Sequence, residues 1–148
     1  MTSIYAILFT TCMLLSAAYL QNKPKPMDLN KYMWENRVLL LFTPDAQNEE
    51  YTKQKTNIST NAKGLPERDM VLIDIEGDDV LRVNGEVQTG ENGKHLREQF
   101  SVAPDAFTIL LLGKDGTEKY RSTNAVPVED IYTIIDQMPM RQQEMRKQ

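Results

Sequence analysis

The sequence predicts an α/β fold in which a central mixed β-sheet is covered by helices on both faces and carries a small inserted β-ribbon. Largely apolar runs of strand length recur at residues 38–42, 70–75 and 107–112. Such runs are typical of strands that are buried on both faces. Segments with helical periodicity separate the runs. Turns rich in Gly and Asp mark the points where strands reverse.

The clearest structural signal lies in residues 107–121, which read FTILLLGKDGTEKYR. An apolar run is followed by Gly113-Lys114-Asp115-Gly116 and then by a more alternating run. This pattern predicts a buried strand, a tight turn and an edge strand. We expect both glycines to supply the positive φ values that such a turn needs.

The segment after the first strand, residues 38–42, predicts a helix. Asp45 is a suitable N-cap, and weak helix formers at residues 57–61 can interrupt the helix. Gly64 and Pro66 are expected to end it. The apolar residues that share one face of this helix are Tyr51, Ile58, Ala62 and Leu65.

Two further helices and a hairpin complete the pattern. Asn84-Gly85 predicts a hairpin turn and hence the small β-ribbon within residues 76–93. Asn92 can cap a short helix that carries Leu96 and Phe100. Pro127 suits the first turn of a last helix, which Pro139 is expected to end; its apolar face is formed by Ile131, Ile134, Ile135 and Met138.

Composition restricts the classes of function. The 148 residues suffice for one compact domain. A net charge of −4 argues against a nucleic-acid partner, because such binding depends on a basic surface. Cys12 and His95 are the only residues of their types. They allow no internal disulfide, no CxxC pair and no multi-histidine metal site, and we expect no cofactor and no bound metal.

The N-terminal residues 1–20 contain no charged side chain and are mostly apolar from residue 4 onward. We interpret them as an export signal, with cleavage after Ala18. A membrane anchor formed by residues 4–20 is the second interpretation, and a core helix is the third. Residues 21–30 are then a linker, residues 31–139 the domain, and residues 140–148 a polar tail that either adds a helical turn or is disordered.

The predicted order, β-α-β followed by α-β-β-α, is the arrangement of the thioredoxin fold. Several segments also match a specific group of proteins: WENRVL at 34–39, FTPD at 42–45, ERD at 67–69, residues 96–100 and 107–119, and IDQMPMR at 135–141. Through these segments the chain resembles an uncharacterised thioredoxin-like domain family of small exported bacterial proteins, whose domain also occurs in vertebrate matrix proteins such as equarin and the sushi-repeat proteins. The resemblance implies the fold without implying a reaction.

Redox chemistry of the thioredoxin type is excluded by the residues present. It needs a thiolate at the start of the first helix, where this chain has Asp45-Ala46-Gln47-Asn48-Glu49. Active thioredoxins have a cis-proline that faces the reactive cysteine. The corresponding place in this chain falls at Phe107, before Thr108. We therefore expect neither disulfide exchange nor peroxide reduction.

The candidate binding residues are expected at the strand ends where open α/β folds bind ligands. Carboxylates there could bind a cation or act as acid and base, but helix capping and solvated loops are the favoured interpretation. The candidates are Thr43, Asp45, Glu49, Arg97, Asp105 and Thr108, with Asn48 beside them.

Arginines form a second set, because they can hold carboxylates bidentately. Arg37 and Arg68 stand just before strands and should lie at the opposite end of the sheet. The set also contains Arg97 and Arg141. Local salt bridges with the neighbouring acids Glu35, Glu67 and Asp69 are favoured for these arginines. The single tryptophan, Trp34, is expected to pack on the core.

These observations lead to two hypotheses. The first is an exported, periplasmic or extracellular, non-redox module that binds another macromolecule or a cell-envelope component. The alternative is a non-redox enzyme that uses the carboxylates at the strand ends for hydrolysis or acid–base chemistry. A pocket joining Asp45, Glu49 and Asp105 would favour the enzyme.

Overall fold

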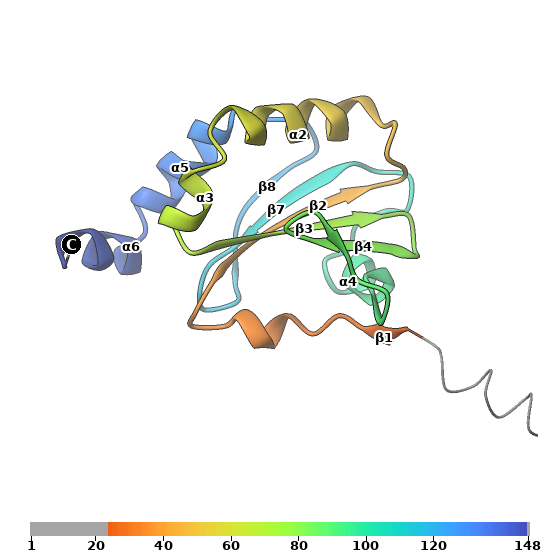
Figure 1. Ribbon diagram of the computed structural model, residues 1–148, viewed down its shortest axis with the longest axis horizontal. Coiled ribbons are helices and arrows are strands. Elements are labelled where there is room, and N and C mark those ends of the chain that lie inside the picture. The colour runs from red at the N-terminus through yellow and green to blue at the C-terminus, as the bar shows by residue number, and fades with distance from the viewer. Residues whose placement is uncertain (1–23, 148) are drawn as a thin grey trace, which may run out of the picture.

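The computed structural model describes residues 24–147, so the predicted export signal or anchor lies outside the described part of the chain (Figure 1). Its centre is a six-stranded sheet with the order β5-β4-β3-β2-β7-β8. β2 and β3 are parallel and the other neighbours antiparallel, which confirms the predicted mixed sheet. The strands are β2 (Arg37–Thr43), β3 (Met70–Glu76), β4 (Val80–Val83), β5 (Glu86–Val87), β7 (Thr108–Leu112) and β8 (Glu118–Ser122).

Helices cover both faces of the sheet, as predicted (Figure 1). Side chains alternate along β2, so that Leu39 and Leu41 enter one core while Val38 and Leu40 enter the other. The first core lies beneath α2 (Glu49–Thr60), α3 (Gly64–Glu67) and α5 (Val128–Asp136). The second is covered by the 3₁₀ helix η1 (Leu29–Tyr32) and by α4 (Lys94–Gln99).

A second, two-stranded sheet ties the beginning of the described chain to the fold. β1 (Lys25–Pro26) runs parallel to β6 (Glu91–Asn92), and Met27 is buried in the second core. Residues 25–27 therefore belong to the folded unit, although the sequence analysis placed them in a linker. The predicted cap of α4 is also corrected: Asn92 belongs to β6, and Gly93 precedes the helix without a side-chain cap.

The start of α2 differs from the prediction. Asn48, not Asp45, is the N-cap, and its Oδ1 accepts a 3.1 Å hydrogen bond from the backbone N–H of Tyr51. The helix ends at Thr60, within the run of weak helix formers at residues 57–61, and its buried residues are Tyr51, Gln54 and Ile58. Ala62 is exposed beyond its end. The glycine expected to end this helix instead begins α3.

Both predicted hairpin turns are present. Asn84 and Gly85 have φ values of 51° and 89°, so they form the expected two-residue turn between β4 and β5. In the turn between β7 and β8 only Gly116 has a positive φ, of 74°. A Cβ at Gly113 would lie 2.5 Å from Lys119 Cε, so the Lys119 side chain would have to move to admit any other residue there.

The C-terminal segment is more ordered than a polar tail. α5 carries its buried face as expected, but Pro139 occupies the first turn of another helix, α6 (Pro139–Arg146). Arg141 of this helix is buried. Between residues 24 and 147, no helix has the length and apolar character needed to cross a membrane.

Candidate functional site

The predicted residues Thr43 and Thr108 lie on neighbouring strands at the carboxyl end of β2, with their side chains on opposite faces of the sheet. Thr43 is the last residue of this strand, and the preceding Phe42 is paired with Thr108 of β7. Both threonine side chains are buried. The Thr43 hydroxyl donates a 2.7 Å hydrogen bond to the backbone carbonyl of Asp45. It thereby holds the loop after β2.

Arg97 of α4 reaches the same end of the sheet and is only 4% exposed. Its Nη2 donates to the carbonyl of Thr43 at 2.6 Å and to that of Ile75 at 3.4 Å. Nε donates to the Gly77 carbonyl and Nη1 to the Ala103 carbonyl, both at 3.2 Å. Burial lowers the pKa of Arg97 below its ordinary value. The guanidinium is occupied by main-chain carbonyls, so it joins four segments and offers no free bidentate edge.

The predicted carboxylates do not gather into a pocket. Asp45, Glu49 and Asp105 are all exposed, and Asp45 Oδ1 accepts a 2.8 Å hydrogen bond from the Gln47 backbone within the loop. The cavity beside Arg97 is lined by residues of α4, by the loop after it and by Asp78; its two carboxylates, Asp78 and Glu98, are not among the predicted ones. No group of His, Cys, Asp and Glu side chains in the described part of the chain could hold a metal ion.

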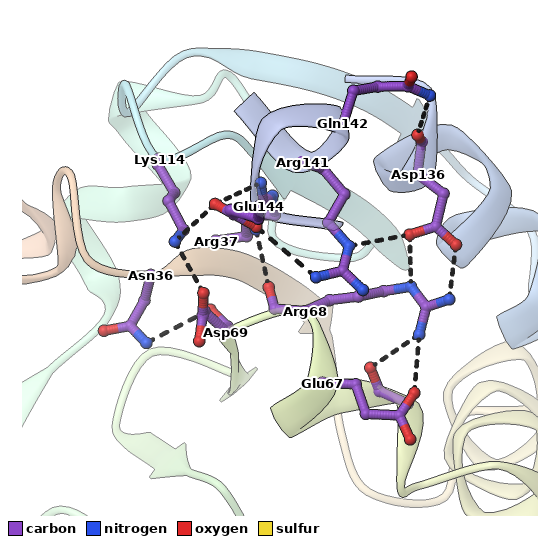
Figure 2. Close-up of polar contacts among 11 residues, drawn as sticks. Asn36, Arg37, Glu67, Arg68, Asp69, Lys114, Asp136, Arg141, Gln142 and Glu144 are labelled. Atoms are coloured by element: carbon purple, nitrogen blue, oxygen red, sulfur yellow. Dashed lines mark hydrogen bonds and ion pairs between the residues drawn. The ribbon is translucent and has the colours of Figure 1, made fainter. Parts of the chain in front are cut away.

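A network of ion pairs lies at the other end of the sheet, where β2 and β3 begin (Figure 2). Arg37, the first residue of β2, is only 1% exposed. Its Nη1 and Nη2 each donate a 3.2 Å hydrogen bond to Glu144 of α6. Nη1 also donates to the Arg68 carbonyl at 3.0 Å. Arg37 therefore fastens α6 to the central strand of the sheet.

Two more arginines share the carboxylate of Asp136, which lies at the end of α5 (Figure 2). Arg68 Nε and Nη2 donate to it at 3.0 and 2.6 Å, and Arg141 Nε donates at 3.2 Å. Burial alone would raise the pKa of Asp136, but hydrogen bonds from Arg68 and Arg141 outweigh burial and lower it. Through Asp136, the two arginines link α3, α5 and α6.

Lys114, from the turn between β7 and β8, completes the network. Its Nζ lies 2.7 Å from Asp69 and 2.9 Å from Glu144. Burial would lower the pKa of Lys114, but these two hydrogen bonds outweigh it and raise the pKa. Burial would likewise raise the pKa of Glu144, but hydrogen bonds from Lys114 and Arg37 lower it. The network is thus a set of ionised, mutually neutralising groups.

The expectation of local salt bridges was therefore wrong for most of these arginines. Glu67 does lie 3.5 Å from Arg68, but Arg37 pairs with Glu144 and not with Glu35. Asp69 pairs with Lys114. Apart from Glu144, the charged residues that meet here come from the segments WENRVL, ERD, GKDG and IDQMPMR, which carried the family resemblance. The sequence signal was present, but it did not show which residues are partners.

A buried acid in β3 also escaped the sequence analysis. Asp74 is 0% exposed; Lys55 Nζ donates to its Oδ2 at 2.8 Å, and its Oδ1 has no partner. Burial outweighs the contact with Lys55 and raises the pKa of Asp74. Beside it, burial raises the pKa of Tyr51, and the charges of Asp74 and Glu76 raise it further. The signal that could have found this cluster is a carboxylate within an otherwise apolar strand.

Trp34 is a second correction. Its side chain is 65% exposed and its φ is +67°, so it does not pack on the core. The backbone N–H of Trp34 donates to the Lys114 carbonyl at 2.6 Å. That bond holds the turn after η1 against the turn between β7 and β8, and leaves the indole at the surface.

Comparison with known proteins places the chain in a family. The family described as "Domain of unknown function (DUF4174)" matches residues 28–144. Coiled-coil domain-containing protein 80 of Danio rerio is 26% identical over 143 residues, which cover 84% of this chain and 16% of that protein. Sushi repeat-containing protein SRPX2 of Homo sapiens is 25% identical over 120 residues, which cover 79% of this chain and 26% of that protein. The predicted family resemblance is confirmed, and the chain spans only a small part of these relatives' length.

Solved structures confirm the thioredoxin-like fold. A thioredoxin peroxidase I of Plasmodium yoelii superposes with a TM-score of 0.59 at 14% identity, covering 79% of this chain and 80% of that one. A yeast mitochondrial 1-Cys peroxiredoxin gives a TM-score of 0.58 at 11% identity, with 83% and 78% covered. At such low identity these likenesses show the fold alone.

Proposed function

The chain belongs to the family described as Domain of unknown function (DUF4174), and we propose that it acts as an exported, non-redox thioredoxin-like module that binds another macromolecule of the cell envelope or extracellular space. This role is non-catalytic. The sushi-repeat and coiled-coil relatives carry the same domain within much longer chains, which supports a modular use of the fold.

The observation that carries the proposal is the set of residues at the start of α2, which is where thioredoxin-type chemistry would take place. The first turn of α2 has Asn48 as its cap, followed by Glu49 and Glu50, and contains no cysteine. A thiolate at a helix N-terminus is what makes such chemistry possible. Carboxylates in that turn stabilise the helix instead. The chain therefore keeps the scaffold without the nucleophile.

The enzymatic alternative gains no specific support from the geometry. The carboxylates Asp45, Glu49 and Asp105 are exposed and do not line the cavity next to them. Arg97, which could have bound an anionic substrate, is occupied by four carbonyls. A site for acid–base catalysis would need convergent groups in a shielded pocket.

Export is part of the proposal, and so is a partner other than nucleic acid. The uncharged apolar residues at the N-terminus are typical of an export signal. The net charge of −4 disfavours binding to nucleic acid. A cell-envelope protein or polymer is the partner class that agrees with both observations.

The redox part of the proposal is tested by insulin-reduction and peroxidase assays on the full chain. Both assays should read zero, and the Cys12→Ser variant is the matched control because it removes the only thiol. Turnover in the wild type that disappears in this variant would overturn the proposal. Turnover that persists in the variant would also overturn the proposal, because it would be redox chemistry that needs no thiol of this chain.

The binding role is tested by chemical crosslinking of the full chain in the cells that produce it, with fractionation of the products. We expect a discrete adduct in the exported fraction, which an excess of the purified chain competes away. An intact chain that stays in the cytoplasm, or one that forms no competable adduct, would overturn this part of the proposal.

A further inference from the structure

A cavity of about 300 Å³ lies beside the ion-pair network, between α6 and the turn that joins β7 to β8. Its cationic lining is Arg37, Lys114 and Lys119, and Asp115 is the acid among its lining residues. The remaining wall is largely apolar and consists of Met138, Pro139 and Met140, which lead into α6. The cavity thus combines three cationic side chains, each paired with a carboxylate of the chain, with an apolar wall.

Arg37, which lines this cavity, has an unsatisfied donor. The side chain is 1% exposed, and its Nε is buried without a hydrogen-bond partner. A buried donor of a charged group that lacks a partner costs free energy, and native structures rarely retain one without a reason. An anion that enters the cavity would meet Arg37 and Lys114 in a setting where water screens their charge less than at the surface.

The protein already places one carboxylate against these same cations. Glu144 accepts from both Nη atoms of Arg37 and lies 2.9 Å from Lys114. This contact shows that the arrangement of cations suits a planar carboxylate, which an arginine can hold bidentately. Glu144 stands on α6, where Arg141 is the buried residue. The helix is therefore attached more by charge than by apolar contact.

We infer that this cavity binds a small carboxylate with an apolar body, and that Glu144 competes with the ligand from within the chain. The carboxylate pairs with Arg37, Lys114 and Lys119, and the apolar body packs against Met138 and Met140. A free carboxylic acid and the C-terminal carboxylate of a peptide share this chemistry. The inference does not rest on the proposed macromolecular partner and can be tested on the isolated full chain.

The ligand chemistry is tested by calorimetric titration with matched pairs of probes. Hexanoate and N-acetylleucine carry the carboxylate, and hexanamide and N-acetylleucine amide lack it. We expect at least one acid to bind and both amides to fail. Hexanoate alone would indicate a free acid as the source, and N-acetylleucine alone a peptide terminus. No binding by either acid, equal binding of acid and amide, or inorganic phosphate binding as tightly as the acids would overturn the assignment.

Variants of the chain test the location. Lys119 pairs with Asp115 and lies outside the network of Figure 2, so Lys119→Gln should leave the fold intact and weaken binding about tenfold. Glu144→Gln removes the internal competitor and should tighten binding about tenfold. Exposed Arg146 on the same helix does not line the cavity, so Arg146→Gln is the control and should change neither. Binding that is unaffected by both Lys119→Gln and Glu144→Gln would overturn the assignment.

Discussion

Arg37 and Glu144, which are 107 residues apart in the sequence, are joined by two hydrogen bonds of 3.2 Å each between the guanidinium and the carboxylate. The arginine begins the central strand, and the glutamate lies on the last helix. The contact therefore joins β2 to α6, two elements that are far apart in the sequence. Because Arg37 is almost completely buried, removal of this partner would leave a buried positive charge without a negative one beside it.

Loss of the Glu144 carboxylate should therefore destabilise the protein. Glu144→Gln leaves Arg37 buried with a neutral partner. The free energy of unfolding should fall by about 2–3 kcal/mol, less than for a fully buried pair because Glu144 is partly exposed. Urea denaturation with an unchanged m-value measures the loss. Glu35→Gln, at the acid that the sequence suggested as the partner of Arg37, is the control, and an equal loss there would contradict the assignment.

The same network predicts instability in acid. The pKa values of Asp136 and Glu144 are lowered in the folded protein because hydrogen bonds from their arginine and lysine partners outweigh burial. Between the ordinary values of 3.8 for Asp and 4.5 for Glu and these lowered values, the unfolded chain binds more protons than the folded one. Stability should thus be complete above the ordinary values and should fall as the pH drops through the lowered values.

Denaturation at a series of pH values between 7 and the acid limit checks this dependence. The double variant Asp136→Asn, Glu144→Gln should be less stable at neutral pH but should have a shallower acid slope than the wild type. Asp105→Asn, which changes an exposed acid outside the network, should reproduce the wild-type slope. A double variant that keeps the full wild-type slope would show that other carboxylates govern the acid transition.

Arg97 should be needed for stability. Replacement by Leu removes the Arg97 donor from the Gly77 carbonyl, and it leaves the Thr43 carbonyl with the backbone N–H of Gly77 alone. We expect a loss of about 2–4 kcal/mol, since hydrogen bonds from a charged group are strong and an unsatisfied carbonyl is costly. Arg97→Lys should recover only part of this, because an ammonium group lacks the planar fork. The urea midpoint measures the loss in both variants, and Arg146→Ala is the control. A wild-type midpoint in Arg97→Leu would show that the hydrogen bonds of Arg97 do not stabilise the fold.

Local patterns in the sequence sufficed for the strands of the six-stranded sheet, both hairpins and the last long helix, but not for β1 and β6. The apolar runs and turn residues of the predicted elements act within a few positions. The N-cap of α2 was missed because Asp45 and Asn48 are both good capping residues, and the choice depends on where the loop after β2 meets the helix. The order of strands followed from alternation of helices and strands, which restricts the connections that are possible.

The ion-pair network could not be predicted from local sequence patterns, although its arginines had been singled out. Arg37 and Arg68 each have an acid nearby in the sequence, yet their main partners lie on α5 and α6. Only tertiary packing brings those helices to the amino ends of β2 and β3. The role of Arg97 was hidden for a similar reason, because its partners are main-chain carbonyls that any sequence would supply.

Trp34, the only tryptophan, provides a test of the last correction. The indole is 65% exposed, so its fluorescence should be that of a water-exposed tryptophan and should be quenched readily by acrylamide. The backbone at this position has a φ of +67°, which costs free energy for any residue except glycine. Trp34→Gly should therefore be more stable than Trp34→Ala by about 1 kcal/mol, although both lose the same side-chain contacts. A buried, unquenched emission would show that Trp34 packs on the core after all, and a glycine variant less stable than the alanine variant would contradict the positive φ.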